Sequence, residues 1–236
     1  MKVLITGASG FLGGHLVDQA LAAGDQVRVV LRPGSKLNCA PEQQQQVEIM
    51  RGDLTDPALA AVLTRGMDVV YHSAALLSDV GRYEIFHAAN VLASQYLVDA
   101  AKANQVARFV FVSSPSIFTD HLDHLQMDES ISYPKQYANY YAQTKALSEQ
   151  YVLAANRPGF TTCSLRPRGI WGPRDVQGFL PKLSAAMANG KLKLLAPGKT
   201  VQVSICHVTN IAQACLAAAR SARVAGHAYF ITGAED

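Results

Sequence analysis

The feature that most constrains this chain is a short apolar strand followed at once by regularly spaced glycines. Lys2–Thr6 (KVLIT) has the composition of a buried strand, and GASGFLG follows it, with glycines at positions 7, 10 and 13 before an amphipathic helix over Phe11–Ala23. Glycines in this place allow a tight turn and bring backbone N–H groups close to a pyrophosphate at the helix N-terminus. The order of strand, glycine turn and helix therefore predicts a dinucleotide-binding unit at the start of the chain.

Short β-rich runs alternate with longer helical patterns through most of the chain. The runs that read as strands are almost continuously apolar, which is typical of a parallel sheet covered by helices on both faces. We therefore expect an α/β fold with a doubly wound parallel sheet. The expected strands are Lys2–Thr6, Val27–Leu31, Val47–Met50, Asp68–Tyr71, Arg108–Val112 and Thr161–Leu165, and the expected helices are Phe11–Ala23, Pro57–Thr64, Tyr83–Asn104 and Tyr137–Asn156.

Composition argues against several other classes of protein. The chain has 236 residues, of which 17% are charged and 49% hydrophobic, enough to bury the core of one large domain. A net charge of +3 without a dense Lys/Arg cluster disfavours nucleic acid as the partner. No apolar run reaches the roughly 18 residues of a membrane span, and the first residues lack the features of a signal peptide. Scattered cysteines, at positions 39, 163, 206 and 215, favour reduced thiols, no metal site and a cytoplasmic location.

The sequence after Arg166 has a different character. Pro, Gly and Lys become more frequent, in PRGIWGPRDVQG and NGKLKLLAPGK, and helices are expected near Phe179–Ala188 and at Thr209–Arg220. We interpret residues 1–166 as the nucleotide-binding domain and residues 167–236 as part of a small substrate-binding lobe, interleaved with the last elements of the sheet. Because ligands of such sheets bind above the carboxyl ends of the strands, this lobe would form a lid.

The glycine spacing is GxxGxxG, and TGASGFLG as a whole resembles the extended branch of the short-chain dehydrogenase/reductase superfamily. That branch includes sugar-nucleotide epimerases, dihydroflavonol reductases and 3β-hydroxysteroid dehydrogenases, and this chain is most similar to the last two groups. The resemblance implies a Rossmann fold that binds NAD or NADP. It also implies that the cofactor contacts Gly7, Ser9, Gly10, Phe11, Leu12 and Gly13.

The end of the second strand indicates which cofactor is bound. A carboxylate at this place accepts hydrogen bonds from the ribose 2′-OH of NAD and would repel the 2′-phosphate of NADP. Here Leu31 is followed by Arg32, and the next acid is Glu42. A guanidinium suits a phosphate in charge and in fork geometry. We therefore favour NADP(H), with Ser35 and Lys36 as helpers and NAD(H) as the alternative, although an ordinary exposed arginine would also fit at this turn.

A segment after the third strand matches the same branch. Gly52-Asp53-Leu54 stands where the family's aspartate binds the adenine amine, so the resemblance assigns Asp53 and Leu54 to the cofactor. Asp53 would equally suit the region that caps a helix before Pro57.

Four further positions match the same branch. Ala74 and Ala75 follow the fourth strand, where small residues let the backbone approach the cofactor ribose. Asn90 corresponds to the family's structural asparagine, and His72 is interpreted as packed or solvent-facing rather than catalytic. Pro167 lies in LRPRGIWGP, which resembles the branch's LRPxxIYGP, and the resemblance implies that it packs on the nicotinamide.

Two segments imply the catalytic residues. Strand five ends in VSSPS, and in the family's register Ser114 is the catalytic hydroxyl, although a strand-end serine could also cap the next turn. Tyr141 and Lys145 are spaced i, i+4, so both lie on one helical face. A tyrosine with pKa near 10 is a poor base at neutral pH, but a nearby lysine and a cationic nicotinamide favour its phenolate. The resemblance implies that Tyr141 moves the proton and Lys145 holds the ribose, while Tyr140 is a neighbour.

The substrate pocket is expected to be apolar, which suits a hydrophobic ketone or secondary alcohol such as a steroid, a flavonoid or a keto-acyl compound. Trp171 replaces the family's tyrosine and would line the pocket or pack in the hinge of the lobe. Extended members usually continue well beyond TGAED, so the chain resembles a form shortened at its C-terminus. The expected contacts are Leu77, Pro115 and Trp171, with Leu76, Ile117 and Phe118 as further neighbours.

Two other functions remain open. A sugar-nucleotide epimerase or dehydratase with bound NAD would use basic residues in the lobe, although Pro115 stands where a dehydratase has an acid. A redox sensor that binds NADP without turnover would typically lack the Tyr/Lys pair. The resemblance also implies a homodimer through the helices at Tyr83–Asn104 and Tyr137–Asn156. The basic residues of the lobe are Arg174, Lys182, Lys191 and Lys193.

Overall fold

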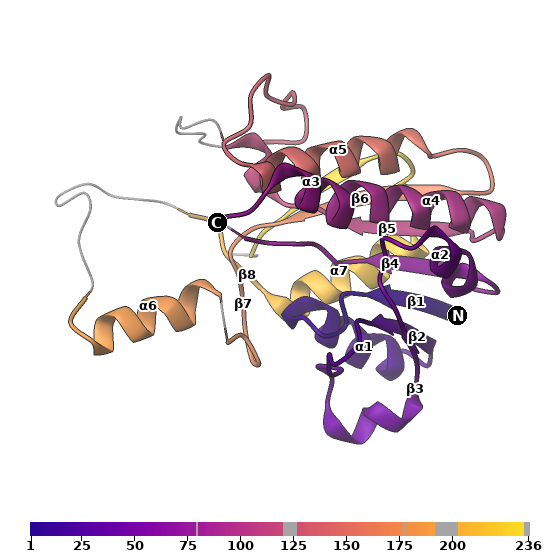
Figure 1. The fold of residues 1–236 in the computed structure, drawn as a ribbon, viewed down its shortest axis with the longest axis horizontal. Coiled ribbons are helices and arrows are strands. Elements are labelled where there is room, and N and C mark those ends of the chain that lie inside the picture. The colour runs from indigo at the N-terminus through magenta and orange to yellow at the C-terminus, as the bar shows by residue number, and fades with distance from the viewer. Residues whose placement is uncertain (79, 120–126, 177, 192–202, 234–236) are drawn as a thin grey trace.

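The computed structural model describes residues 1–78, 80–119, 127–176, 178–191 and 203–233, and within these ranges the main sheet has seven strands. All neighbouring strands pair in parallel, and their order is β3-β2-β1-β4-β5-β6-β9 (Figure 1). This confirms the predicted Rossmann type of α/β fold. The strands are β1 (Lys2–Thr6), β2 (Gln26–Leu31), β3 (Val47–Arg51), β4 (Val69–His72), β5 (Arg108–Val112), β6 (Thr161–Pro167) and β9 (Ala228–Ile231).

Helices cover both faces of the sheet, which explains why its strands are apolar throughout. On β1, Val3 and Ile5 pack in one core cluster and Leu4 in the other, because successive side chains of a strand point to opposite faces. Helices α1 (Phe11–Ala22) and α7 (Val208–Arg220) cover the first face, and α2 (Pro57–Thr64), α4 (Ala93–Ala103) and α5 (Tyr140–Ala154) the second (Figure 1).

Two of the predicted helices differ from the observed ones. The segment predicted as one helix at Tyr83–Asn104 consists of α3 (Tyr83–Phe86), a π-helical turn η2 (His87–Leu92) and α4. The helix predicted from Tyr137 begins at Tyr140 instead, because the Asn139 side chain accepts a hydrogen bond from the amide of Ala142 at 2.8 Å and caps it. Between β2 and β3, Gln43–Gln46 lies in a short 3₁₀ helix, η1 (Pro41–Gln46).

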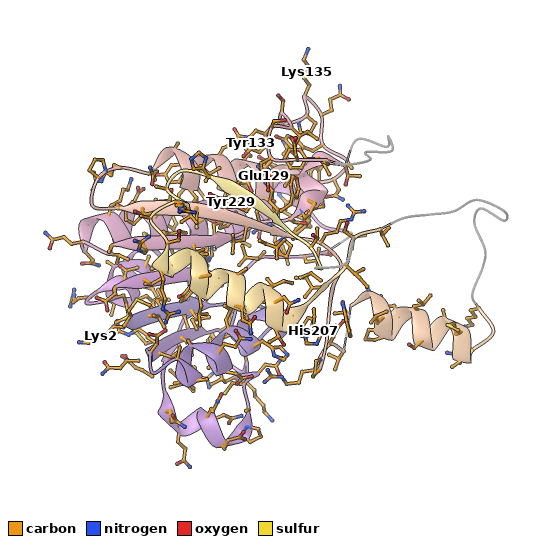
Figure 2. The ribbon with its side chains drawn as sticks, turned by 180° about the vertical axis from the view of Figure 1, so that it is seen from behind. Lys2, Glu129, Tyr133, Lys135, His207 and Tyr229 are labelled. Carbon is orange, nitrogen blue, oxygen red and sulfur yellow. The ribbon has the colours of Figure 1, made fainter. Side chains whose placement is uncertain are left out.

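The chain after β6 is divided between the sheet and a smaller part. Strands β7 (Ile170–Trp171) and β8 (Cys206–His207) form a separate two-stranded sheet, and α6 (Phe179–Ala188) projects away from the main body (Figure 1). The chain then returns to the main sheet: α7 lies across it, and β9 pairs with β6 (Figure 2). Lys193 lies outside the described residues.

Because the strands are parallel, the carboxyl ends of β1, β4 and β5 lie side by side. The chain leaves β1 toward β2 on one side, whereas β4 lies on the other side of β1. These carboxyl ends therefore form the topological switch point at which such sheets bind ligands.

None of the described helices is both long and apolar enough to cross a bilayer. The four cysteines are buried and free, and the described residues contain no cluster of His, Cys, Asp and Glu that could hold a metal ion.

Candidate active site

The glycine loop fits closely against its neighbours. Gly7 has a φ of 74°, a left-handed conformation that favours glycine, and a Cβ there would lie 2.8 Å from the amide nitrogen of Ala74. A Cβ at Gly13 would overlap the carbonyl of Gly7. Gly10 is the N-cap of α1 and offers no side-chain acceptor, so no side chain caps the first amides of this helix. The loop is thus a cradle of backbone donors that fits a pyrophosphate.

Arg32 lies at the start of a tight turn directly after β2. The Ser35 amide donates to the carbonyl of Arg32 at 3.0 Å, and Gly34 has a φ of 80°, which together with Pro33 matches a type II turn. Arg51, at the end of β3, donates to the carbonyls of Arg32 and Ser35 at 3.3 and 2.7 Å. The Arg32 side chain is exposed at the end of β2, as is that of Lys36 nearby.

Asp53 occupies a turn of its own. Its carboxylate accepts hydrogen bonds from the amide and the hydroxyl of Thr55, at 2.9 and 2.8 Å, and these bonds hold the pKa of Asp53 below its ordinary value. The positive charge of Arg32 adds to this effect. The N-cap of α2 is Asp56 rather than Asp53, and Leu54 packs against the core.

His72 is packed inside the protein, as one of its two sequence interpretations stated. Its ring is fully buried, and burial lowers its pKa to about 3. Nδ1 lies 2.7 Å from the hydroxyl of Thr6, and Nε2 lies 2.9 Å from that of Ser94. The amide of Ala74 also donates to the Thr6 hydroxyl, so this network fixes the backbone that lies against Gly7. Ala75, the residue after Ala74, is exposed.

Asn90 lies in the π-helical turn η2 and joins two parts of the site. Its side chain accepts a hydrogen bond from the amide of Leu76 at 2.7 Å and donates to the carbonyl of the same residue at 3.3 Å. It also donates to the Thr144 hydroxyl at 2.9 Å. The extra residue of a π-helical turn is common near functional sites, and here it aims an amide at both the loop after β4 and helix α5.

Ser114 takes the capping role, one of the two that the sequence left open. It follows β5 and is the N-cap of the 3₁₀ helix η3 (Pro115–Phe118), where its hydroxyl accepts from the amide of Ser116 at 3.2 Å. The hydroxyls of Ser114 and Ser116 are 2.9 Å apart. The Ser114 hydroxyl also lies near enough to Tyr141 to lower the pKa of its phenol, which brings two of the predicted catalytic residues together.

Tyr141 and Tyr140 are adjacent in sequence but lie in different surroundings. Burial raises the pKa of the Tyr141 phenol, and the nearby Ser114 hydroxyl lowers it by a smaller amount. Tyr140 instead packs against the rings of Tyr83 and Phe86 in α3, with ring centroids 5.5 and 6.2 Å away. Of the two tyrosines, Tyr141 is therefore the one that faces the hydroxyl of the site.

Lys145 lies one turn after Tyr141 on the same helix and is buried. Its ammonium donates to the carbonyl of Val112 at 2.6 Å and lies 3.9 Å from the centre of the Phe111 ring. Burial lowers its pKa to about 7, while the negative charge of Glu149 opposes this shift. Lys145 is thus a lysine whose charge changes near neutral pH.

A buried ion pair between α5 and β6 was not predicted from the sequence. The guanidinium of Arg166 donates to both oxygens of Glu149, at 2.6 to 3.2 Å, and Ser164 and Tyr133 donate to the same carboxylate. Burial raises the pKa of Glu149, but these donors more than offset it and hold the pKa below its ordinary value. Tyr133 lies in the loop segment above β9 (Figure 2). The available signal was the i, i+4 spacing of Glu149 from Lys145.

The residues proposed as substrate contacts fall into two groups. Leu77 is 73% exposed, and Trp171 is 37% exposed with its ring packed on His207. By contrast, Pro115, Ile117 and Phe118 are buried in η3, and the last two form a small core cluster. Packing encloses Ile117 and Phe118, and their place beside the substrate stays a prediction.

Other residues line a groove beside the start of α5. It has a volume of about 320 Å³ and lies between the loop after β4, α3 and the start of α5. Leu76, the remaining expected neighbour, is bound by Asn90 through its backbone, and Pro167 ends β6 beside β9. The residues that line the groove are Ser78, Val80, Gly81, Phe86, Tyr137, Ala138, Asn139, Tyr140 and Gln143.

Among proteins of known sequence, several with named activities are similar over the whole chain. A 2-alkyl-3-oxoalkanoate reductase from Stenotrophomonas maltophilia (strain K279a) is 37% identical, over 100% of this chain and 71% of its own length. A 3 beta-hydroxysteroid dehydrogenase/Delta 5-->4-isomerase from Mycobacterium tuberculosis (strain CDC 1551 / Oshkosh) is 33% identical, over 99% of this chain and 65% of its own length.

Among solved structures, the UDP-N-acetylglucosamine 4-epimerase from Methanobrevibacter ruminantium M1 has a TM-score of 0.84 and 26% identity, over 98% of this chain and 76% of its own. The dTDP-glucose 4,6-dehydratase from Streptomyces venezuelae, solved as a double mutant with NAD, has a TM-score of 0.82 and 27% identity, over 98% of this chain and 75% of its own. The NAD dependent epimerase/dehydratase family matches residues 3–232. The chain therefore belongs to this family and is an NAD(P)-dependent oxidoreductase of the extended short-chain dehydrogenase/reductase type.

Proposed function

We propose that the protein interconverts a ketone and a secondary alcohol on an apolar substrate, with NADP(H) as the cofactor. The observation that carries this proposal is the arrangement of Ser114, Tyr141 and Lys145. The Tyr141 phenol lies near the Ser114 hydroxyl beyond the carboxyl end of β5, and Lys145, with a lowered pKa, follows Tyr141 one turn later on α5. These are the groups that moving a proton to or from a substrate oxygen requires.

The glycine loop supports a nicotinamide dinucleotide as the cofactor. The space beside Gly7 and Gly13 admits no side chain, and the first amides of α1 have no side-chain cap. Gly7, Ser9, Gly10, Phe11, Leu12 and Gly13 would hold the pyrophosphate region, and Ala74, Ala75 and Pro167 would lie beside the ribose and nicotinamide. When bound, the nicotinamide supplies a hydride to the ketone carbon, or accepts one from the alcohol carbon.

Arg32 supports NADP(H) over NAD(H). Its exposed guanidinium directly follows β2, and its backbone is fixed by Arg51 in a turn that contains no carboxylate. A phosphate dianion would gain a charge-assisted, bidentate partner there. Structures of relatives solved with NAD, such as the dehydratase named above, support a nicotinamide dinucleotide in general, so the choice of NADP(H) rests on Arg32.

In the reducing direction, Tyr141 donates its proton to the oxygen of the substrate while Ser114 orients that oxygen. The raised pKa of Tyr141 keeps the phenol protonated at neutral pH, which suits this role. In the oxidising direction the proton moves from the alcohol to Tyr141, and protonated Lys145 favours the phenolate by its charge. Lys145 would also hold the cofactor ribose.

The names of the relatives support an apolar ketone as the substrate. Besides the two enzymes above, a ketoreductase from Stigmatella aurantiaca named for a farnesyl-dihydroquinoline oxide is 36% identical over 98% of this chain and 68% of its own length. Each of these names describes a keto or hydroxy group on a largely hydrocarbon compound. The exposed Leu77 and the groove beside Tyr140 supply apolar surface for such a compound.

The adjacent tyrosines allow a matched test of the mechanism. Purified protein is given NADPH and a panel of steroid, flavonoid, β-keto-acyl and small aldehyde substrates, and the nicotinamide absorbance is followed. We expect Tyr141→Phe to lower kcat by about 10²- to 10⁴-fold, because it removes the proton donor. Tyr140→Phe should retain turnover, since Tyr140 packs on α3. Undiminished turnover by Tyr141→Phe would disprove the mechanism.

The cofactor preference is tested separately. Arg32→Ala should weaken NADPH binding and leave NADH binding nearly unchanged, whereas Arg65→Ala, at another exposed position, should alter neither. Nicotinamide fluorescence measures both affinities without a substrate. An unchanged NADPH/NADH ratio in Arg32→Ala would contradict the assignment of NADP(H).

A sugar-nucleotide epimerase or dehydratase is the second candidate, because the similar solved structures named above have those activities. Two features weigh against it. Arg174, one of the basic residues available to a sugar diphosphate, is paired with Asp18. Ser114 is followed by Pro115, where a dehydratase requires an acid. Conversion of a UDP- or dTDP-hexose without net change in nicotinamide absorbance would favour this candidate.

A further inference from the structure

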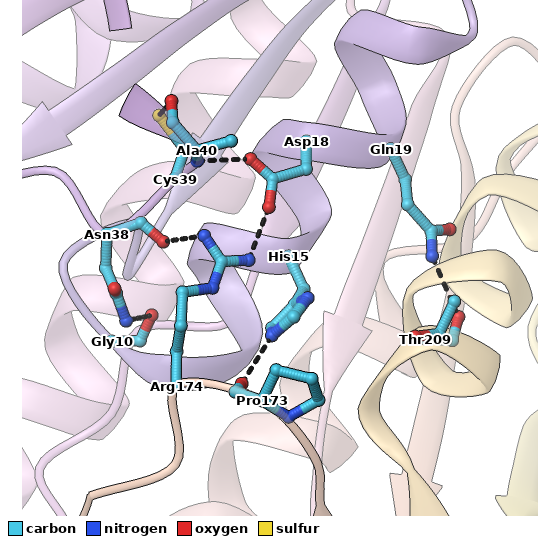
Figure 3. Close-up of polar contacts among 10 residues, drawn as sticks. All are labelled: Gly10, His15, Asp18, Gln19, Asn38, Cys39, Ala40, Pro173, Arg174 and Thr209. Atoms are coloured by element: carbon cyan, nitrogen blue, oxygen red, sulfur yellow. Dashed lines mark hydrogen bonds and ion pairs between the residues drawn. The ribbon is translucent and has the colours of Figure 1, made fainter. Parts of the chain in front are cut away.

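Three segments that are distant in sequence meet at Arg174 (Figure 3). Its guanidinium forms an ion pair with Asp18 of α1 and donates to the carbonyl of Asn38 at 2.8 Å. The other oxygen of Asp18 accepts from the amide of Ala40 at 2.8 Å. His15, one turn before Asp18, contacts the carbonyl of Pro173 at 2.8 Å. The segment after β7 is thus fastened both to α1 and to the chain after β2.

The backbone at Arg174 shows that these contacts hold it against a conformational cost. Its φ is 67°, in the left-handed region, which is unfavourable for a residue with a Cβ. Such a conformation persists where its surroundings fix it. Both side chains of the ion pair are mostly shielded, at 28% and 21% exposure. The pair is therefore less screened than one at an open surface.

The chain after β2, residues 32–40 (here the Arg32 loop), is fixed at both of its ends. Arg51 holds the first turn, as described above. At the far end, the backbone amide of Asn38 donates to the carbonyl of Ala8 at 3.0 Å, and the Asn38 side chain donates to the carbonyl of Gly10 at 3.3 Å. A Cβ at Gly14 would overlap the Asn38 carbonyl. Arg174 and Asp18 hold this same end from the outside.

We propose that Arg174 is a positioning residue for the cofactor: by holding Asn38 and Asp18, it keeps the Arg32 loop in place for a 2′-phosphorylated dinucleotide. This rests on the proposed function for the role of Arg32. It assigns to the cofactor side an arginine that the sequence left available to a sugar diphosphate. Arg174 acts through the loop and touches no reacting atom, so its loss affects cofactor affinity rather than kcat.

Cys39 provides a direct readout of the loop, since it lies between Asn38 and Ala40. Its thiol is 5% exposed, and burial raises its pKa, so it should react slowly with a thiol reagent while the loop is in place. In Arg174→Gln we expect Cys39 to react at least about tenfold faster, and Cys163 and Cys215 to react as in the wild type. Mass spectrometry of the labelled peptides distinguishes the sites.

Affinity for the cofactor is measured on the same proteins by nicotinamide fluorescence. We expect Arg174→Gln to weaken NADPH binding by about tenfold and NADH binding by less, because the loop that carries Arg32 is no longer preorganised. With saturating NADPH, kcat should stay within about twofold. Arg174→Lys, which keeps the charge but not the fork, should give intermediate values and serves if the glutamine variant does not fold. Arg223→Gln, an exposed arginine elsewhere, should match the wild type.

Three results are decisive. Unchanged Cys39 labelling in both Arg174 variants overturns the proposal that Arg174 holds the loop. Faster labelling with unchanged affinity for both dinucleotides overturns the proposal that this loop position matters to the cofactor. A wild-type protein that binds neither dinucleotide contradicts the proposed function instead, and the labelling result alone then decides whether Arg174 holds the loop.

Discussion

The site has a proposed cofactor end at the glycine loop and a proposed catalytic end around Ser114, Tyr141 and Lys145, and the two are held together in different ways. At the cofactor end, backbone packs on backbone, and Gly13 has no room for even one methyl group beside Gly7. At the catalytic end, buried charged side chains set the geometry, namely Lys145 and the pair of Glu149 with Arg166. The first arrangement tolerates no added atom, whereas the second tolerates no unpaired charge. Mutations of opposite kinds, which add volume or remove charge, should therefore separate the two ends.

The largest effect is expected from removing a charge at the catalytic end. Glu149→Ala leaves the Arg166 guanidinium buried without its partner, which should lower the free energy of unfolding by about 3–5 kcal/mol. Urea denaturation measures this change. Glu48→Ala removes a carboxylate that is 57% exposed and paired with Arg28, and it should cost less than about 1 kcal/mol. If the two variants are equally stable, buried charge does not organise this end.

Adding one methyl group at the cofactor end should have the next largest effect. Gly13→Ala forces the helix and the glycine loop apart, which should cost about 1–3 kcal/mol and weaken dinucleotide binding. Thermal denaturation with and without NADPH measures both quantities. Gly66→Ala is the control, because Gly66 has a φ of 71° in open space far from the loop. Gly66→Ala should lower the free energy of unfolding by roughly 1 kcal/mol without changing the affinity for the dinucleotide. A wild-type affinity for the dinucleotide in Gly13→Ala would contradict the comparison.

A third prediction uses pH to examine the buried lysine. The pKa of Lys145 is lowered from its unfolded value to about 7, so the unfolded state binds more protons and the wild type loses stability as pH falls from about 10 to 7. Below pH 7 this loss is complete. Relative to the wild type, Lys145→Met should therefore gain stability on going from pH 10 to pH 6.5, by urea midpoint. If the stability difference between Lys145→Met and the wild type does not vary with pH, the pKa of Lys145 is not lowered by folding.

The smallest effect is expected at Ser116. Ser116→Ala removes a hydroxyl 2.9 Å from that of Ser114 but leaves the Ser116 amide that Ser114 also accepts from. It should change the free energy of unfolding by less than about 1 kcal/mol, and kcat on the best substrate by less than about threefold. Loss of turnover in Ser116→Ala but not in Ser114→Ala would exchange the roles of the two serines.

The same contrast explains what the sequence could predict. The glycine loop was predictable because its requirement is local: spacing and a preceding strand define it. Glu149 and Arg166 are also close in sequence, but they meet across α5 and β6, and neither residue type signals burial by itself. The pairing of Arg174 with Asp18 spans most of the chain. Such contacts depend on packing, which periodicity does not reveal.

Other expectations are of a different kind. The parallel sheet, six of the seven strands described in it and the family were predictable because hydrophobic pattern and turn chemistry agreed along the chain, whereas β9 was not among the expected strands. The division at residue 166, the homodimer, the cytoplasmic location and the preference for NADP(H) stay predictions. The start of α5 differed from the predicted one because a cap at Asn139 decided it, and helix ends depend on such single residues.

The order of strands in the sheet has a consequence for how the protein is made. After β1 and β2 have paired, β3 joins β2, and then β4, β5, β6 and β9 each join at the opposite edge, next to a strand already in place. A ribosome releases the chain in this same order, so the sheet can grow outward without opening any earlier pair. From β4 onward the newest strand forms the edge at which the sheet grows, while β3 remains the other edge. A pause in translation after β4, β5 or β6 thus exposes that strand to pairing with other chains, and the arrival of the next strand ends that exposure.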